Sequence, residues 1–219
     1  MPDSLIVVGV DVGGSKKGFH AVALKDRKYL CRKSSRDPAE IVGWCREKRA
    51  RYIGVDAPCG WRLDKSTLRC AERQLRSRGI SSFPTPTPEG AATTPFHYWM
   101  LCGEALFRAL SSEYPLFDGN SRPKPDPTCF ETFPQAVACA LAGKTVSAKG
   151  SEKRTVRREL LEKFEVELSE LRNIDWLDAA LCALTADFFA RGRVTAYGDA
   201  ITGFIVVPNL QQIPEDSGL

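Results

Sequence analysis

The 219 residues can bury a substantial core, and a composition of 43% hydrophobic and 26% charged residues is that of an ordinary globular protein. The formal net charge of +4 permits a nucleic-acid partner without requiring one. No apolar run approaches the roughly 18 residues of a transmembrane helix, so we expect no membrane partner. We expect a single domain over residues 1–219, with an insertion at about 81–127.

The eight cysteines bear on the compartment in which the protein works. The chain is too large to need disulfides for stability, and we expect no secretory signal peptide. It contains no CxxC pair and only two histidines, which argues against a structural zinc site. We therefore expect buried free thiols in a cytoplasmic protein.

The first quarter of the chain predicts three strands, a helix and a fourth strand. Pro38 follows Asp37, a good N-cap, and begins the helix. Three meandering strands followed by a helical crossover are the opening of an RNase H-like fold. We therefore expect an α/β protein with a mixed five-stranded sheet flanked by helices. The strands expected here cover residues 5–11, 18–24, 28–32 and 51–55.

The middle of the chain is interrupted by prolines. Pro84, Pro86, Pro88 and Pro95 exclude regular structure between two predicted helices. The insertion should pack at one edge of the sheet as helix and loop. The helices expected after residue 60 cover 66–79, 99–110 and 134–142. A further helix should end at 164, and the last helix should carry Asp175 and Asp178. The strands expected in the same part cover 128–133 and 203–207.

Two aspartates directly follow apolar runs. Asp11 ends LIVVGVD and Asp56 ends RYIGVD, so both should lie at the carboxyl ends of strands, where open α/β sheets bind ligands. Asp175 and Asp178 are three residues apart in a segment of helical period and should be neighbours on one helix. Such carboxylates would repel one another without a cation. The pattern therefore predicts a site for Mg²⁺ or Mn²⁺.

Several longer motifs resemble one family over most of the chain. The stretches GVDAP, FPTPTP, FETFPQAVACALAG, KRTVRRELL and GFIVVP, with a D-x-x-D-A-A pattern, resemble the RNase H-like predicted nucleases of domain-of-unknown-function family 429. The resemblance implies Mg²⁺-dependent hydrolysis of phosphodiester bonds in DNA or RNA by a two-metal site. It also implies that Asp11 bridges both metals and that Asp56 holds one. Asp178, with or without Asp175, would hold the other.

Each candidate also has a structural interpretation. Asp11 and Asp56 could terminate strands or cap turns, and Asp175 could be the N-cap of its helix. Glu131, in an aromatic predicted strand, is a further catalytic candidate, but it could instead pair with an arginine or lysine. Asp178 lies on an otherwise apolar helix, where a structural role is harder to justify.

Basic segments could contact the phosphates of a nucleic acid. A solvated helix face is the alternative for about half of these residues. Aromatic residues near the proline-rich stretch could stack on bases or anchor the core. The basic candidates are Lys16, Lys17, Arg69, Arg73, Arg154 and Arg157. The aromatic candidates are Trp61, Phe96, His97, Tyr98 and Trp99.

Two other functions remain open. The segment GVDVGGSKKG is similar to the first phosphate loop of sugar kinases and actin-like ATPases, which share this fold core. That class needs a second phosphate loop and a second lobe, and neither is evident here. The other alternative is a catalytically idle RNase H-like binding module. The carboxylate set argues against it, because an idle site should not keep so much unpaired charge.

Overall fold

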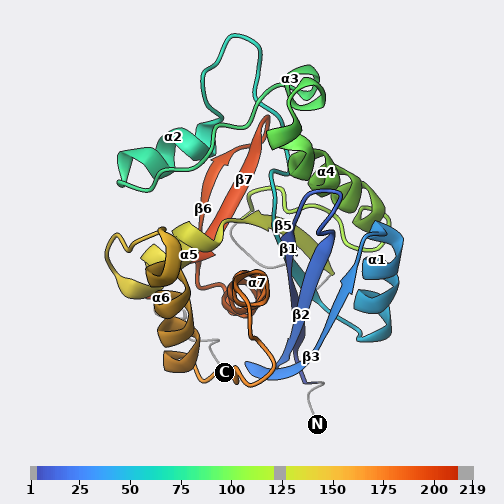
Figure 1. The fold of residues 1–219 in the computed structure, drawn as a ribbon, viewed down its shortest axis with the longest axis vertical. Helices are drawn as coiled ribbons and strands as arrows, with labels where there is room; N and C mark the ends of the chain where they lie inside the picture. Colours follow the sequence, from blue (N-terminus) through green and yellow to red (C-terminus); the bar gives the residue numbers. More distant parts are fainter. Residues whose placement is uncertain (1–3, 121–126, 212–219) are drawn as a thin grey trace.

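A computed structural model describes residues 4–120 and 127–211, which form one sheet with helices on both faces (Figure 1). No helix in these two ranges is long and apolar enough to cross a membrane. The strands are β1 (Ile6–Val12), β2 (Phe19–Lys25), β3 (Lys28–Ser35), β4 (Tyr52–Asp56), β5 (Thr128–Thr132), β6 (Val194–Asp199) and β7 (Gly203–Pro208). The helices are α1 (Pro38–Glu47), α2 (Cys70–Ser77), α3 (Pro88–Thr93), η1 (Pro95–His97), α4 (Tyr98–Leu110), α5 (Pro134–Ala142), α6 (Gly150–Lys163) and α7 (Ile174–Ala190).

The sheet has the strand order β3-β2-β1-β4-β5-β7-β6. β1, β2 and β3 form an antiparallel meander, whereas β4, β5 and β7 run parallel to β1. This arrangement confirms the predicted RNase H-like α/β fold with a mixed sheet. The predicted number of five strands is wrong, because the sheet has seven. β7 corresponds to the strand expected at 203–207, whereas β6, at the edge beyond it, was not expected. β6 escaped prediction because all six of its residues are half-buried at an edge, so no buried face marks its sequence.

The helix of the predicted insertion covers a face of the sheet. α4 lies beside α1, and its apolar side, with Leu106 and Leu110, packs with Val8 and Ile53 of the central strands (Figure 1). The prediction that this segment packs at an edge is therefore wrong for α4. Its apolar stripe is broad enough to join the core, where burial stabilises it. Residues 121–126 of the predicted insertion lie outside the described residues.

Regular structure also occurs inside the proline-rich stretch. Pro88 begins the short helix α3, and the Thr87 hydroxyl accepts a hydrogen bond from the Gly90 amide at 3.2 Å. Proline suits the first turn of a helix because the amide it lacks would have no partner there. The prediction that these prolines exclude regular structure is therefore wrong at Pro88, which starts α3, and at Pro95, which starts η1.

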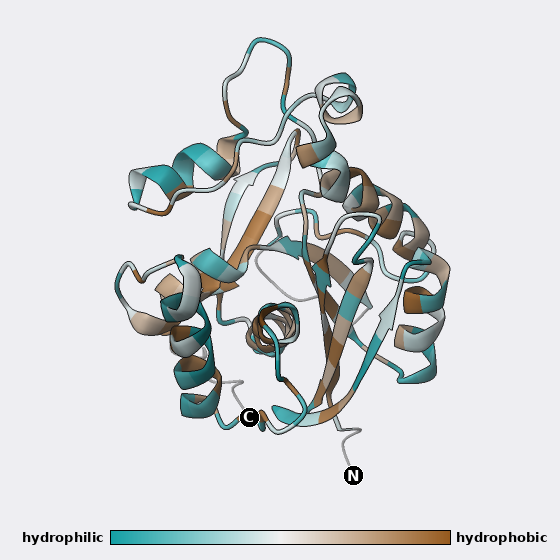
Figure 2. Cartoon of the chain, in the orientation of Figure 1, coloured by the Kyte–Doolittle hydropathy of each residue, from teal (hydrophilic) through white to brown (hydrophobic). Residues whose placement is uncertain are grey.

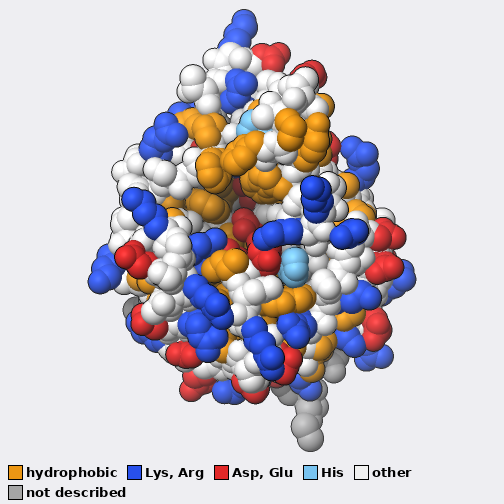
Figure 3. Space-filling view, viewed as in Figure 1, with side chains coloured by type: hydrophobic (Ala, Val, Ile, Leu, Met, Phe, Trp, Pro, Cys, Tyr) orange, Lys and Arg blue, Asp and Glu red, His pale blue; other side chains and the backbone are white. Residues whose placement is uncertain are grey.

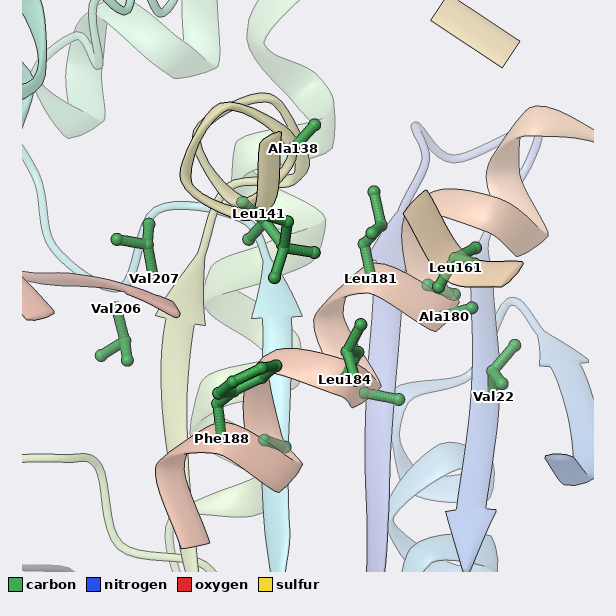
Figure 4. Packing of buried hydrophobic residues seen from close by; sticks show 14 of the residues in the cluster. Val22, Ala138, Leu141, Leu161, Ala180, Leu181, Leu184, Phe188, Val206 and Val207 are labelled. Atoms are coloured by element: carbon green, nitrogen blue, oxygen red, sulfur yellow. The ribbon is translucent and has the colours of Figure 1, made fainter. Parts of the chain in front are cut away.

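α7 is the central helix of the opposite face. It is apolar around most of its circumference, whereas α6 beside it is largely hydrophilic (Figure 2). Leu181, Leu184 and Phe188 of α7 form one cluster with Leu141 of α5 and Leu161 of α6 (Figure 4). A helix that is apolar on all sides belongs inside the core. α7 is therefore held between the sheet and its neighbouring helices.

Two glycines let α7 lie directly on the sheet. Gly9 of β1 and Gly54 of β4 are partners in the parallel ladder. A Cβ atom on Gly9 would lie 2.0 Å from the carbonyl oxygen of Ala179, and one on Gly54 would lie 2.6 Å from that of Cys182. Such distances are far below van der Waals contact. The absence of side chains at both positions therefore sets the distance between the helix and the strands.

Replacing Gly9 by alanine should destabilise the protein strongly. The added methyl group would meet helix backbone, so we expect a loss of about 3 kcal/mol in the free energy of unfolding. Chemical denaturation measures this loss beside Gly43→Ala, a control in α1 whose added Cβ would lie 4.0 Å from its nearest neighbour. The control should be neutral or stabilising, because alanine favours a helix over glycine by about 1 kcal/mol. Equal stability of the two variants would contradict the close packing of α7 on β1.

Candidate metal centre

Asp11, Asp56 and Asp178 converge at the carboxyl end of the central strands. Asp11 and Asp56 are direct neighbours in the ladder between β1 and β4. Each lies two residues beyond a glycine that faces α7, so its side chain points toward the same helix. Asp178 comes from the second turn of α7. One carboxylate oxygen from each of the three residues lies within 4.8 Å of the others. The predicted convergence of these side chains is therefore present.

The molecular surface shows how the carboxylates are presented. On the face in Figure 3, acidic side chains lie in a hollow near the centre, and basic side chains lie beside it. Hydrophobic side chains gather on one rim of the hollow. A negatively charged floor with positive charge beside it suits a cation with an anionic ligand.

The clustered carboxylates raise one another's affinity for protons. Burial, and then the charges of Asp56 and Asp178, hold the pKa of Asp11 well above its ordinary value. Burial and the charge of Asp178 likewise raise the pKa of Asp56, although Lys153 and Arg157 oppose the shift. A divalent cation would remove this repulsion, because its charge inverts the local electrostatics. The donor set, which consists of carboxylate oxygens, therefore fits Mg²⁺ or Mn²⁺.

Two cations from α6 hold Asp178. Lys153 Nζ donates to Asp178 Oδ2 at 2.7 Å, and Arg157 Nε donates to Asp178 Oδ1. The Arg157 guanidinium also donates to the Gln135 side chain at 3.2 Å. Lys153 and Gln135 are functional candidates that the sequence did not single out. The spacing of Lys153 and Arg157, four residues apart on one helix, was the signal that could have linked them.

Asp175 lies at the rim of the cluster. It accepts hydrogen bonds from Lys17 Nζ at 3.0 and 3.2 Å, and this bond raises the pKa of Lys17. The N-cap of α7 is Asn173, so the alternative that Asp175 is the N-cap is wrong. His20 of β2 is close to the same part of the cluster, with Nδ1 4.0 Å from Asp11 Oδ2 and its ring against Trp176, and burial lowers its pKa.

Glu131 belongs to a separate buried network. Arg69 donates to its two carboxylate oxygens at 2.8 and 2.6 Å and to Glu72 at 3.1 Å. The Cys59 amide donates to Glu131 at 2.8 Å, and the Thr85 hydroxyl donates to Glu72 at 2.5 Å. Arg69 is only 2% exposed. The structure thus supports the alternative of an ion pair for Glu131, in place of catalysis. It corrects the phosphate contact expected of Arg69, whose role here is structural.

The other basic candidates differ in exposure. Lys16, Arg73 and Arg154 are exposed, as is Lys17 with its partner Asp175. Three of the four already have partners, because Lys17 binds Asp175, Arg73 donates to the Leu68 carbonyl and Arg154 donates to the Arg172 carbonyl. Arg157 is only 1% exposed, so it cannot contact a ligand that stays on the outer surface.

A cavity of about 360 Å³ opens beside the cluster. Asp56, Asp178, Lys153 and Arg157 line one part of it, and Phe83 is among the apolar residues that line the rest. Two of the three candidate metal ligands, Asp56 and Asp178, therefore line a pocket that has both charged and apolar walls.

The raised pKa values predict how stability depends on pH. An aspartate titrates near 3.9 in the unfolded chain and at higher pH in this fold, so the folded protein binds more protons between the two values. The free energy of unfolding in a chelator should therefore fall as pH rises above about 4, until Asp11 and Asp56 are ionised. His20 has the opposite effect on the free energy of unfolding. Because its pKa is lowered in the fold, the unfolded chain binds its proton more readily, and stability is lost as pH falls.

Comparison of the wild type with Asp11→Asn isolates the carboxylate contribution. Urea denaturation in a chelator between about pH 4.5 and 8 should show a shallower decline for the variant. Addition of Mg²⁺ should flatten the wild-type curve at its upper end. Parallel curves for the two proteins would contradict the raised pKa of Asp11.

Comparisons with known proteins place the chain in a family. The family model described as "Protein of unknown function (DUF429)" matches residues 9–202. None of the curated proteins compared matches the chain. RuvC from Thermus thermophilus is similar in structure, with 17% sequence identity, 85% of this chain and 96% of that chain covered, and a TM-score of 0.44. T. thermophilus RuvC in complex with a Holliday junction substrate gives 17% identity, 85% and 95% coverage, and a TM-score of 0.45. Since the family match spans most of its length, the chain belongs to the DUF429 family of proteins of unknown function.

Proposed function

We propose that this protein is a metal-dependent phosphodiesterase that cleaves DNA or RNA. The convergence of Asp11, Asp56 and Asp178 within 4.8 Å carries the proposal. Carboxylate oxygens are the ligands that Mg²⁺ and Mn²⁺ prefer. The raised pKa values of Asp11 and Asp56 also support it, since buried like charges are costly to a fold and are typical of functional sites.

The positions of the three carboxylates are compatible with this chemistry. Bound Mg²⁺ or Mn²⁺ would acidify a water molecule and stabilise the charge that develops on the phosphate. Asp11 and Asp56 would hold the ion from adjacent strands, with Asp11 shared where two ions bind, and Asp178 would hold it from α7. Asp175 would act at the rim, where it positions Lys17. All three ligands lie on packed strands and a buried helix, so their backbones are already in place. Metal binding by Asp178 would have to share or displace its hydrogen bonds from Lys153 and Arg157.

The proposed polymer partner rests on charge around the hollow. Lys16, Lys17, Arg73 and Arg154 are exposed and would contact backbone phosphates, which position a nucleic acid without reading its sequence. The eight cysteines are all free thiols. Free thiols persist in reducing compartments, which supports a cytoplasmic site of action.

A kinase-like phosphotransferase is less well supported. The glycine turn after β1 uses its amides internally, because Gly13 N donates to Gly18 O at 2.8 Å and Lys17 N donates to Gly14 O at 2.9 Å. These amides therefore serve the turn and are not aimed at a phosphate. The described ranges form a single sheet, whereas that class closes two lobes over its nucleotide.

Purified protein, divalent cations and a panel of polymers test the proposal. Single-stranded, duplex and branched DNA and RNA are incubated with Mg²⁺, Mn²⁺ or Ca²⁺. We expect cleavage of at least one polymer with Mg²⁺ or Mn²⁺ and little turnover with Ca²⁺, whose looser coordination positions the attacking water poorly. Calorimetric titration with Mn²⁺ alone should show saturable binding.

The two measurements separate the ways in which the proposal can fail. An absence of saturable Mn²⁺ binding would overturn the metal centre itself. Metal binding without cleavage of any polymer would instead favour a small phosphate ester as substrate, or an idle binding module.

A further inference from the structure

We propose that the 360 Å³ cavity binds one unpaired nucleotide, with its phosphate at Lys153 and Arg157 and its base against Phe83. The inference deepens the proposed function and rests on it, because it names the form of nucleic acid that reaches the carboxylates. The substrate class would be a strand with an unpaired or extruded nucleotide. A continuous base-paired duplex would not enter.

The charged end of the cavity contains a guanidinium with an unused donor. Arg157 donates through Nε to Asp178 and through Nη2 to Gln135, but its buried Nη1 has no hydrogen-bond partner among the described residues. Buried polar groups in proteins nearly always have a partner, so an exception indicates a ligand or an ordered water. Arg157 is among the residues that line the cavity, and an anion bound there that reached Nη1 would supply that partner.

Lys153 adds a second cation at the same end. Its ammonium has three donors, and its hydrogen bond to Asp178 uses one of them. The side chain is 30% exposed, so the remaining donors face accessible space. A phosphate between Lys153 and Arg157 would lie beside Asp56 and Asp178, the metal-binding side of the pocket. The phosphate to be attacked and the candidate metal ligands are thus adjacent.

The other wall of the cavity is apolar and aromatic. Phe83, Phe133 and Pro134 line it. Phe83 is 66% exposed and contacts Phe96 edge to face, with ring centroids 5.0 Å apart. An exposed aromatic ring at the mouth of a charged pocket offers a stacking surface for a base, whichever base it is.

Size decides between an unpaired nucleotide and a duplex. The cavity lies at the lower end of the range for small-molecule sites, roughly 300–1,000 Å³. Enzymes that act on a nucleotide inside such a pocket take it out of the stack, since a paired base cannot enter. The pocket therefore fits a single nucleotide with its base unpaired.

Binding of small ligands tests the inference without turnover. The wild-type protein is titrated calorimetrically with adenosine monophosphate, ribose 5-phosphate, inorganic phosphate and adenosine, once in a chelator and once with Ca²⁺. We expect adenosine monophosphate to bind about tenfold or more tightly than ribose 5-phosphate, because only the former can stack on Phe83. Adenosine should bind more weakly than the monophosphate, since it lacks the phosphate.

Two variants at accessible positions localise the ligand. Lys153→Met should weaken binding of the monophosphate about tenfold, whereas Lys163→Met, the matched control at the far end of α6, should leave it unchanged. Phe83→Ala should remove the preference for adenosine monophosphate over ribose 5-phosphate, while Phe83→Leu should retain part of it. Circular dichroism confirms that each variant is folded.

Each result has a defined meaning. Equal affinity for the monophosphate and for inorganic phosphate would overturn the nucleotide and leave a simple anion site. If the monophosphate shows no saturable binding either in the chelator or with Ca²⁺, the proposal that the cavity binds a nucleotide is overturned. Equal effects of Lys153→Met and Lys163→Met would also overturn it. Polymer cleavage with no monophosphate binding would leave the nuclease proposal intact and remove this inference. Monophosphate binding with no cleavage of any polymer would support the nucleotide site and count against the nuclease proposal.

Discussion

Asp11→Asn should reduce cleavage by on the order of 10²–10³-fold or more while making the metal-free protein more stable. The substitution keeps the shape of the side chain but removes the charge that would bind a cation. It also removes one member of a buried cluster in which Asp11 and Asp56 have raised pKa values. Relief of that repulsion should raise the free energy of unfolding at neutral pH by about 0.5–2 kcal/mol, the usual gain from a stabilising substitution.

The paired changes in activity and stability distinguish a metal site from a structural one. Cleavage rates are measured with Mn²⁺, and denaturation midpoints are measured in a chelator, beside Asp64→Asn, an exposed control with the same change of charge. The control should alter neither quantity. Equal cleavage by Asp11→Asn and wild type would identify a contaminating nuclease. A variant less stable than wild type in the chelator would show that Asp11 supports the fold.

Arg69→Met should destabilise the protein by about 3–5 kcal/mol, the usual cost of breaking a buried ion pair. Arg69 lies between Glu131 and Glu72, and all three side chains are buried. Without the guanidinium, two carboxylates would be left in the core with no cation between them. Because Glu72 also binds Thr85, the proline-rich stretch would loosen with it.

Thermal denaturation measures this effect as a fall in Tm of roughly 6–20 °C for a chain of this length. Arg73→Met, an exposed position on the same helix, is the control and should change Tm little. The double variant Arg69→Met with Glu131→Gln should recover part of the loss, because it removes one stranded charge. If Arg69→Met kept its stability but lost affinity for nucleic acid, the phosphate contact expected from the sequence would be correct after all.

The amino-acid sequence by itself determined the sheet core and the position of the carboxylates. Apolar runs that end in Asp11 and Asp56 specify strands and their carboxyl ends, and the helical period places Asp178 on a buried helix. These features are local, since each depends on residues a few positions apart. The strand ends also meet in space, because neighbouring parallel strands place their carboxyl ends at the same edge of the sheet. The RNase H-like fold and the convergence of Asp11, Asp56 and Asp178 could therefore be predicted.

Only the tertiary structure decided which charges are partners. Arg69, the N-cap of α2, has a local partner in Glu72, but its other partner, Glu131, is 62 residues away in sequence. Residue order therefore did not reveal that Arg69 is buried and Arg73 exposed. Lys153 likewise acquires its role from Asp178, which the packing of α6 against α7 brings within 2.7 Å. A charged side chain interacts with whatever the fold places nearby, so its role depends on distance and burial that residue order does not encode. The strand ends follow from local patterns, whereas the cations around them follow from how the helices pack.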